Sequence, residues 1–249
     1  MIRIGTAGWS IPRAFSDQLL GEGSHLQRYA RLFNAVEINS SFHRSHRRTT
    51  YERWAASVPD GFRFAVKLPK TITHQRKLID CDDAIGAFAE EVTGLGDRRG
   101  PILVQLPPRL EFDPAIVLPF FERLAIVVGG ALVCEPRHPS WFDPAADDEL
   151  VQLRVARVAA DPPPAPGAAV PGGWQGLTYT RWHGSPAVYR SAYSEEAIAP
   201  LATRLRAADV ESWAIFDNTA SGAATGNALA LRAECSRQSV VLRRGIAYR

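Results

Sequence analysis

The chain has 249 residues, 46% of them hydrophobic, which is enough to fill the core of one sizeable domain. Its 29 basic and 26 acidic side chains leave a formal net charge of +3, and this small excess does not by itself establish a nucleic-acid-binding surface. The three cysteines are widely spaced and odd in number, which excludes a disulfide scaffold and favours reduced thiols in a cytoplasmic protein.

No part of the sequence has the pattern of a membrane-spanning or secreted protein. The most apolar stretch, residues 124–134, is too short to cross a bilayer and contains Gly129 and Gly130. The amino terminus enters its first predicted strand directly, so we expect no signal peptide. We therefore expect a cytoplasmic protein without a membrane partner, folded as a single domain over residues 1–249.

Eight short apolar runs, each ending at a polar or charged residue, are predicted to be strands. In chain order they are Ile2–Gly5, Ala35–Ile38, Phe62–Lys67, Ile102–Gln105, Ala131–Glu135, Val155–Asp161, Leu177–Arg181 and Trp213–Asp217. Such a succession is typical of a (β/α)₈ barrel, an α/β fold in which side chains at the carboxyl ends of the strands meet around one pocket. We therefore predict a single barrel of the TIM type.

Helix signals separate most of these strands. Residues 24–33 and 49–58 are predicted to be helical, and Thr49 with Glu52 matches the pattern of a capping box. Further helix starts are predicted at Asp113 and Asp143, each followed by proline, at Ser194, and near Asn227 for the last helix.

The connection between the sixth and seventh strands departs from this pattern. Residues 162–173 are rich in proline and glycine and cannot hold a regular helix. We expect an irregular, helix-poor sixth crossover that runs over the rim of the barrel. It could serve as a substrate lid, although a plain surface insertion is the commoner use of such a loop.

Seven motifs, in order along the chain, resemble those of a known family. They are Gly5–Trp9, Val36–Phe42, Phe64–Lys67 with Ile72–His74, Val104–Pro108, Glu135–Trp141, Tyr179–Gly184 and Phe216–Thr219. Over essentially its whole length the chain thus resembles the YecE-like family, domain of unknown function 72. The resemblance implies a TIM-type barrel but no reaction. His43 stands where the family usually has Tyr, and Ala7 where it usually has Ser or Cys, so no role for a phenol at position 43 follows.

The segment Glu135–Trp141 is the densest group of chemically active residues. Prolines 136 and 139 restrict the backbone on either side, so Glu135, Arg137 and His138 are presented on a rigid loop. A carboxylate, a guanidinium and an imidazole held this way suit proton transfer or anion binding. The alternative is a structural network in which Arg137 pairs with Glu135, but charge is costly to bury at a barrel mouth without a use.

Lys67 ends the third predicted strand in a chain that has only three lysines. A lysine, unlike an arginine, can lose its proton and act as a base or as a Schiff-base amine. The alternative is a structural ammonium bonded to neighbouring carboxylates. The nearby Lys70 and Lys77 weaken the argument from rarity.

A divalent metal ion is an alternative because carboxylates and imidazoles are expected together at the rim. The acidic candidates are Glu37, Glu135, Asp161 and Asp217, and the histidines are His74, His138 and His183. No HxH or HExxH pattern supports a site, and four predicted cations, Arg44, Lys67, Arg137 and Arg181, would neutralise the carboxylates and repel a metal. We therefore predict no metal ligand and no cofactor.

The loop after the last strand offers an anion site. Residues 220–226 are mostly small and lead into the last predicted helix. In many barrels such a loop and the helix N-terminus bind phosphate through backbone N–H groups. A flexible turn accounts for the same sequence equally well.

The leading hypothesis is an enzyme that uses general acid–base chemistry on a small anionic or polyhydroxylated ligand at the carboxyl-terminal rim. The predicted catalytic residues are Glu37, Lys67, Glu135 and Asp217. The predicted ligand-binding residues are Asn39, Arg44, His74, Gln105, Arg137, His138, Trp141, Arg181, His183 and Asn218, of which Arg137, His138, Arg181 and His183 are expected to hold the anionic part. The alternatives are a nucleic-acid-binding or nucleic-acid-processing protein, a metal-dependent hydrolase or isomerase on the same barrel, and an inert binding protein.

Overall fold

The computed structural model describes residues 1–19 and 21–245 and has a mixed α/β fold with two largely parallel sheets. In pairing order, the first sheet consists of β1 (Ile2–Thr6), β10 (Glu211–Phe216), β9 (Leu177–Trp182) and β7 (Ala159–Asp161). The second consists of β2 (Ala35–Ile38), β3 (Arg63–Lys67), β4 (Arg99–Gln105), β5 (Leu132–Glu135), β6 (Val155–Arg157) and the antiparallel β8 (Gly172–Gly173). All eight predicted strands are present, and the sixth is divided at Val158 into β6 and β7.

The two sheets approach each other at two places. Ala7, just beyond β1, forms a parallel bridge with Glu37 of β2, and the N–H of Gly8 donates to the Glu37 carbonyl over 2.8 Å. On the other side only Val158 separates β6 from β7, and its N–H donates to the carbonyl of Cys134 over 2.8 Å. The carboxyl ends of the parallel strands in both sheets therefore lie at the same end of the molecule.

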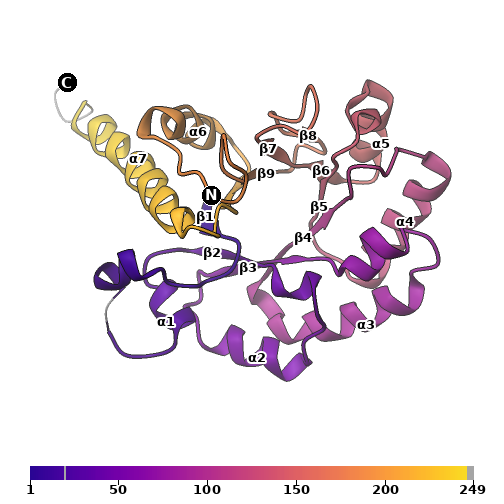
Figure 1. Ribbon diagram of the computed structural model, residues 1–249, viewed down its shortest axis with the longest axis horizontal. Coiled ribbons are helices and arrows are strands. Elements are labelled where there is room, and N and C mark those ends of the chain that lie inside the picture. The colour runs from indigo at the N-terminus through magenta and orange to yellow at the C-terminus, as the bar shows by residue number, and fades with distance from the viewer. Residues whose placement is uncertain (20, 246–249) are drawn as a thin grey trace.

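The helices lie around the outside of the strands, in chain order, as Figure 1 shows. They are α1 (His25–Tyr29), α2 (Arg48–Ala56), α3 (Asp82–Val92), α4 (Pro114–Val127), α5 (Pro144–Gln152), α6 (Glu195–Ala207) and α7 (Ala223–Gly245). Shorter helical segments are η1 (Arg13–Leu19), η2 (Ser40–Phe42), η3 (Thr71–Gln75), η4 (Thr93–Arg98) and η5 (Pro139–Phe142). In α3, Ile85, Phe88 and Val92 recur at helical spacing and form its buried face. Among the described residues, no helix is both long enough and apolar enough to cross a lipid bilayer.

Several predicted helix starts are confirmed. The Asp113 carboxylate accepts from the N–H of Ala115, and the Ser194 hydroxyl accepts from the N–H of Ala197. Asp143 is also an N-cap residue, but its side chain makes no capping hydrogen bond. The last helix starts at Ala223, four residues earlier than predicted, so that Asn227 lies inside it and bonds the backbone of Tyr193.

The predicted capping box of Thr49 and Glu52 is wrong. Helix α2 already begins at Arg48, so Thr49 lies within its first turn, and the Glu52 carboxylate pairs with Arg48 at 3.0 Å instead of reaching back to the backbone. The capping box is found in α1, where the Ser24 hydroxyl accepts from the N–H of Gln27 and the Gln27 amide oxygen accepts from the N–H of Ser24. The backbone N–H groups of Ser24 and Gln27, two of the donors that a helix start leaves without partners, are thereby satisfied.

The sixth crossover is irregular, as predicted. Within the part of the chain that the structure describes, no helix lies between β7 and β9, and β8 is the regular element found there. The Asp147 carboxylate of α5 accepts from the N–H of Gly173 over 2.9 Å and pairs with Arg157 of β6 at 2.7 Å. These bonds attach the crossover to α5 and β6 in the manner of a surface insertion.

A cluster of apolar side chains on the strands, here called the inner cluster, is distinct from the core between strands and helices. Its members are Ala7, Ala35, Ala65, Leu103, Val133, Ala156, Val158, Leu177, Tyr179, Trp213 and Ile215. The rings of Tyr179 and Trp213 stack in it, with centroids 5.8 Å apart and planes inclined by 14°. Residues two apart on a strand point to the same side. The next residues on that side are the buried polar groups Glu37, Lys67, Gln105, Glu135, Arg181 and Asp217.

The caps of α1 and α2 give a matched stability test. Because the Ser24 side chain satisfies a helix donor, Ser24→Ala is expected to lower the free energy of unfolding by about 1 kcal/mol. The control is Thr49→Ala, which removes an exposed hydroxyl without a capping bond and is expected to change stability by less than about 0.5 kcal/mol. Urea denaturation measures both, and equal losses would contradict the assignment of the caps.

Candidate active site

Side chains from four strand ends meet around the guanidinium of Arg181, which is 0% exposed. Its Nε and one terminal nitrogen donate to the two oxygens of Glu37 over 3.0 and 2.9 Å, a bidentate pair. The same nitrogen also donates to Asp217 over 2.8 Å, and the other terminal nitrogen donates to Glu135. These three carboxylates come from β2, β5 and the end of β10, so Arg181 on β9 links both sheets. Arg181 and its three carboxylate partners are called the arginine network below.

Three further side chains bind the carboxylates of the arginine network. The His183 ring bonds Glu135 through Nε2 at 2.9 Å and Asp217 through Nδ1 at 3.1 Å. The Tyr179 hydroxyl donates to Glu37 over 2.9 Å, and Arg137 donates to Glu135 over 3.0 Å. Each carboxylate therefore has at least two partners, which is the condition under which buried charge is tolerated.

Two carboxylates of the arginine network, Glu135 and Asp217, are held in the ionised form. Burial acts to raise the pKa of Glu135, but Arg181, His183 and Arg137 outweigh it and hold this pKa well below its ordinary value. Burial also acts to raise the pKa of Asp217, which Arg181 and His183 nevertheless keep below its ordinary value. Neither carboxyl group is therefore an effective proton donor near neutral pH.

The histidine of the network is stabilised as a cation. Burial acts to lower the pKa of His183, but the charge of Glu135 and the hydrogen bonds that the ring donates to Asp217 and Glu135 raise it above its ordinary value. With Arg181 and Arg137, a protonated His183 gives three positive charges opposite three carboxylates. The arginine network, counted together with Arg137 and His183, is then neutral as a whole.

Lys67 lies at the end of β3, beside this network but not bonded to it. The residue is 7% exposed, and its Nζ atom lies 4.2 Å from the centre of the Phe42 ring. Within the described residues, this amine makes no hydrogen bond and no ion pair. Burial, followed by the charge of Arg181, lowers the pKa of Lys67 to about 8, although the three network carboxylates oppose this shift. Lys67 is therefore a buried amine that titrates close to physiological pH.

His74 also contacts the Phe42 ring. Its ring contacts that of Phe42 edge-on at 5.0 Å, and its Nδ1 bonds the Thr73 hydroxyl at 2.8 Å. Burial, and then the charges of Lys67 and Arg137, lower the pKa of His74 below its ordinary value. The imidazole is therefore mainly neutral at pH 7 and can exchange a proton with a ligand or with a nearby group.

Three buried polar atoms near the strand ends have no hydrogen-bond partner among the described residues. They are Oδ1 of Asn39, Nε of Arg137 and Oδ1 of Asn218. Asn39 follows β2, Arg137 follows β5 and Asn218 follows β10, so all three belong to loops at the carboxyl ends of strands. A buried polar atom without a partner costs free energy, and a bound ligand would relieve that cost.

Other residues predicted for the site lie apart from the network or are bound to backbone. The His138 ring caps η5 by accepting from the N–H of Ser140 at 3.3 Å, and the fully buried Trp141 donates to the carbonyl of Leu110 and packs on Phe112. Arg44 is exposed on the surface. The His138 and Trp141 side chains therefore bond the backbone of the chain itself.

Gln105 and Asp161 were also expected at the rim. Gln105 is buried on the same side of its strand as the network residues, but its amide donates to the carbonyl of Leu106 over 2.8 Å. Asp161 binds the Tyr193 hydroxyl at 2.7 Å and does not join the network. Among residues 1–19 and 21–245, no group of three or more His, Cys, Asp or Glu side chains is arranged to hold a metal ion.

Tyr179 and Phe42 are the contributors that sequence reasoning did not assign to the site. Tyr179 shares a strand and a face with Arg181, two residues away, so the alternation along β9 was the available signal. Phe42 ends one of the family motifs, but nothing in the sequence pairs it with Lys67.

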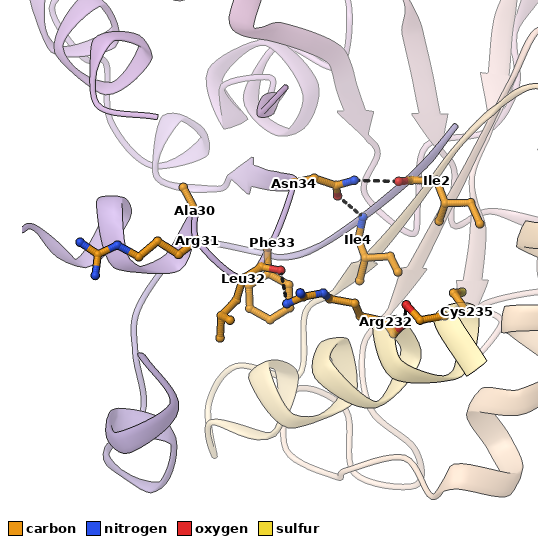
Figure 2. A pocket seen from close by; sticks show the side chains of 10 residues that line it. Ile2, Ile4, Ala30, Arg31, Leu32, Phe33, Asn34, Arg232 and Cys235 are labelled. Carbon is orange, nitrogen blue, oxygen red and sulfur yellow. Dashed lines mark hydrogen bonds between the residues drawn. The ribbon is translucent and has the colours of Figure 1, made fainter. Parts of the chain in front are cut away.

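A larger hollow lies away from the arginine network. A cavity of about 550 Å³ lies between the start of β1, the residues after α1, and α7 (Figure 2). There the Asn34 amide bonds the backbone of Ile2 and Ile4, and Arg232 donates to the carbonyl of Leu32. The network residues do not line it, so the charged centre and this hollow are separate features.

The fold and site define an α/β protein of parallel strands whose carboxyl ends hold a buried, charge-balanced centre. Residues 3–246 match the family model described as protein of unknown function DUF72, and the chain belongs to this family. It is 34% identical over 170 residues to the UPF0759 protein YecE of Escherichia coli K12, and 27% identical over 164 residues to the UPF0759 protein YunF of Bacillus subtilis 168. These matches cover 66% and 63% of this chain but only 60% and 57% of the relatives' lengths.

Solved structures show the same fold. A DUF72 family protein from Enterococcus faecalis V583 superposes with a TM-score of 0.78 at 22% identity, covering 94% of this chain and 95% of that one. Another from Thermotoga maritima MSB8 gives 0.76 at 24% identity, covering 94% and 98%. A sugar phosphate isomerase/epimerase from Parabacteroides distasonis gives 0.55 at 10% identity, covering 94% of each chain. At these identities the likeness concerns the fold alone.

Two histidines are expected to give opposite pH dependence of stability. His183 has its pKa raised above the unfolded value of 6.5, so its contribution is complete below pH 6.5 and is lost as the pH rises through the folded-state pKa. We expect His183→Gln to cost about 1.5–3 kcal/mol near pH 6 and progressively less at higher pH.

His46 is the matched control, because burial, followed by the charge of Arg44, lowers its pKa. The folded state then binds fewer protons than the unfolded chain, so wild-type stability falls as the pH drops through 6.5, and His46→Gln should remove that loss. Urea titrations from about pH 5 to about pH 10 measure both variants. The same sign for both would refute the assigned electrostatics.

Proposed function

We propose that this protein is an enzyme that performs general acid–base chemistry on a small ligand at the carboxyl ends of its strands, with Lys67 as the group that transfers the proton. One observation carries the proposal: the Lys67 amine is buried, has no hydrogen-bonding partner in the described part of the chain, and has a pKa lowered to about 8. A general base is most effective when its pKa lies near the working pH.

The architecture behind this proposal is a closed barrel. We infer that the two sheets form one (β/α)₈-type barrel with an irregular sixth crossover. The Ala7–Glu37 bridge and the continuity of the chain through Val158 support closure. The bonds of Arg181 to carboxylates of both sheets support it further, since they draw the carboxyl ends of the strands together. A ligand at this rim would meet side chains from many strands.

The network carboxylates support Lys67 rather than replace it. Glu135 and Asp217 stay ionised, and Glu37 is bonded on both oxygens, so we assign all three to electrostatic stabilisation. Negative charge beside Lys67 favours the ammonium that forms when the amine accepts a proton from a ligand. Neutral His74, on the same Phe42 ring, is placed to relay that proton.

We infer that the ligand is polyhydroxylated, and that it is small. The unpartnered Oδ1 atoms of Asn39 and Asn218 are acceptors, and the unpartnered Nε of Arg137 is a donor. A ligand with several hydroxyl groups both donates and accepts, and so satisfies such a mixed set. A nucleic-acid backbone calls for an excess of positive charge, whereas carboxylates and cations balance at this centre.

The cytoplasm is the proposed location. Cys81 and Cys134 are free thiols, and both are buried. Burial raises the pKa of Cys81 to about 11 and that of Cys134 well above its ordinary value, which makes both thiols poorly reactive. Unpaired, inert thiols of this kind are typical of proteins from a reducing compartment.

The titration of Lys67 tests the proposal directly, since the chain has only three lysines. In protein labelled with ¹³C-lysine, we expect one Cε resonance to titrate at a pKa of about 8. The resonance should vanish in Lys67→Arg and persist in the matched controls Lys70→Arg and Lys77→Arg. If all three lysines titrate near about 10.4, the ordinary value, Lys67 is not the proton-transfer group.

A search for turnover tests the chemistry itself. We expect the protein, incubated in D₂O with a panel of small sugars, hydroxy ketones and sugar acids, to exchange a carbon-bound proton of one of them, as ¹H NMR detects. Lys67→Met should slow this exchange by about 10²–10⁴-fold, and Lys70→Met should leave it unchanged.

Two results of that experiment would redirect the proposal. Equal exchange by the wild type and Lys67→Met would remove Lys67 from the mechanism. Trapping of a ligand on Lys67 by borohydride, seen by mass spectrometry, would show that the amine acts by forming a Schiff base instead of as a base.

A further inference from the structure

A small cavity beside the arginine network has a composition unlike the rest of the site. Its volume is about 190 Å³, and it is lined by Thr6, Ala7, Gly8, Ser10, Pro12, Thr219, Gly222, Ala224 and Thr225. Hydroxyl groups and backbone make up its polar surface, and none of the described residues that line it carries a charge. Pockets for whole drug-sized ligands span about 300–1,000 Å³, so this cavity fits one chemical group of a ligand.

The cavity lies next to the proposed reaction centre. The N–H of Ala7 donates to the carbonyl of Phe216 over 3.0 Å, and Ala7 also bridges to Glu37. Phe216 directly precedes Asp217 along the chain. Two network carboxylates therefore flank the strand ends that form this cavity, and a ligand held here extends naturally toward the centre.

The N-terminus of the longest helix in the described part of the chain lies at this cavity. Helix α7 runs for 23 residues from Ala223, and its first turn contributes Ala224 and Thr225 to the lining. The N–H of Ala224 donates to the Asn218 carbonyl over 3.2 Å, whereas no hydrogen bond from the N–H of Thr225 is found among the described residues. First-turn N–H groups and the helix dipole together favour an anion.

Thr225 provides the independent sign of a ligand. The residue is 3% exposed and lines the cavity, yet its hydroxyl forms no hydrogen bond within residues 1–19 and 21–245. Thr203, farther along α6, uses its hydroxyl to bond the carbonyl of Ala199 at 3.1 Å. The Thr225 side chain is buried and lines the cavity, and its unbonded hydroxyl is available to a bound group.

The backbone around the cavity permits close approach. Gly8 and Gly222 both have φ of +81°, a conformation that L side chains rarely adopt. A Cβ atom at Gly222 would lie 2.9 Å from Pro12, whereas the space next to Gly8 is open. The small residues of this loop therefore leave room for one chemical group beside the buried first turn of α7.

We propose that this cavity is the subsite for the phosphoryl group of a small phosphorylated substrate. The inference rests on the proposed function, because it specifies the class of ligand that meets Lys67. A phosphoryl group has three oxygens to accept from the α7 backbone, the Thr225 hydroxyl and the exposed hydroxyls of Ser10 and Thr219. It needs no side-chain cation there, which agrees with the uncharged lining.

Titration of the whole protein with inorganic phosphate, followed by calorimetry and ³¹P NMR, tests the subsite. We expect saturable binding that Thr225→Val, which keeps the side-chain shape but removes the hydroxyl, weakens by about tenfold or more. Thr203→Val is the matched control on α6 and should bind phosphate like the wild type. Acetate, which has two oxygens where inorganic phosphate has four, should bind more weakly than phosphate.

A second variant covers the case in which Thr225→Val is poorly folded. Thr219→Asp places a carboxylate on the exposed side of the cavity, next to a helix N-terminus that tolerates it, and should abolish phosphate binding by charge repulsion. No saturable phosphate binding by the wild type, undiminished binding by a folded Thr225→Val or Thr219→Asp variant, or equal affinity for acetate would overturn the subsite.

The outcome is separable from that of the proposed function. Phosphate binding requires no proton transfer, so it can be found even if Lys67 titrates as an ordinary lysine. A pKa of about 8 at Lys67 without phosphate binding would leave the acid–base proposal standing and remove only the phosphorylated substrate.

Discussion

The burial of one guanidinium is the constraint on which this structure depends. Arg181 is removed from water and makes four hydrogen bonds to carboxylates, so the positions of Glu37, Glu135 and Asp217 are fixed with respect to one another. Breaking a buried ion pair by removing one partner costs about 3–5 kcal/mol, because the other charge is left uncompensated. Separating any one of these carboxylates from Arg181 would therefore cost free energy, so the ion pairs hold the strand ends in fixed relative positions. Arg181 fixes the positions of these carboxylates. Because its N–H donors are already bonded to them, few remain to bind an anionic ligand.

Charge balance in the network explains why the neighbouring lysine is unusual. Positive and negative groups nearly cancel around Lys67, so the cost of burial decides its protonation. A lysine paired with one of these carboxylates would stay charged. Arginine, which binds carboxylates in a bidentate fashion, occupies them and leaves the lysine amine unpaired. The two cations therefore have different properties. Arg181 fixes the positions of the carboxylates, and Lys67 can gain or lose a proton.

Much of this arrangement could be predicted from the sequence, since strand positions and the polar residues at their ends follow from alternation and from turn residues. Glu37, Lys67, Glu135, Arg181, His183 and Asp217 are indeed brought together. His138, Trp141 and Gln105 do not bond the network, because each side chain bonds a backbone group instead, and such bonds cannot be predicted from spacing or composition. The capping box was predicted at the wrong helix because the Glu52 carboxylate can either cap the backbone or pair with Arg48. Only the observed helix start at Arg48 decides between these two interactions.

The stacked pair of Tyr179 and Trp213 has a consequence for how such a protein could change over time. The pair fills the interior from the β9 and β10 side, opposite small residues such as Ala35 and Ala65, and the Tyr179 hydroxyl holds Glu37. Trp213 is therefore linked to Glu37 through the Tyr179 ring and hydroxyl, without contacting this carboxylate itself. Replacements deep beneath the strand ends can therefore shift the position of Glu37 while every residue of the arginine network stays the same, so divergent members of a lineage can differ at this centre without differing in its residues.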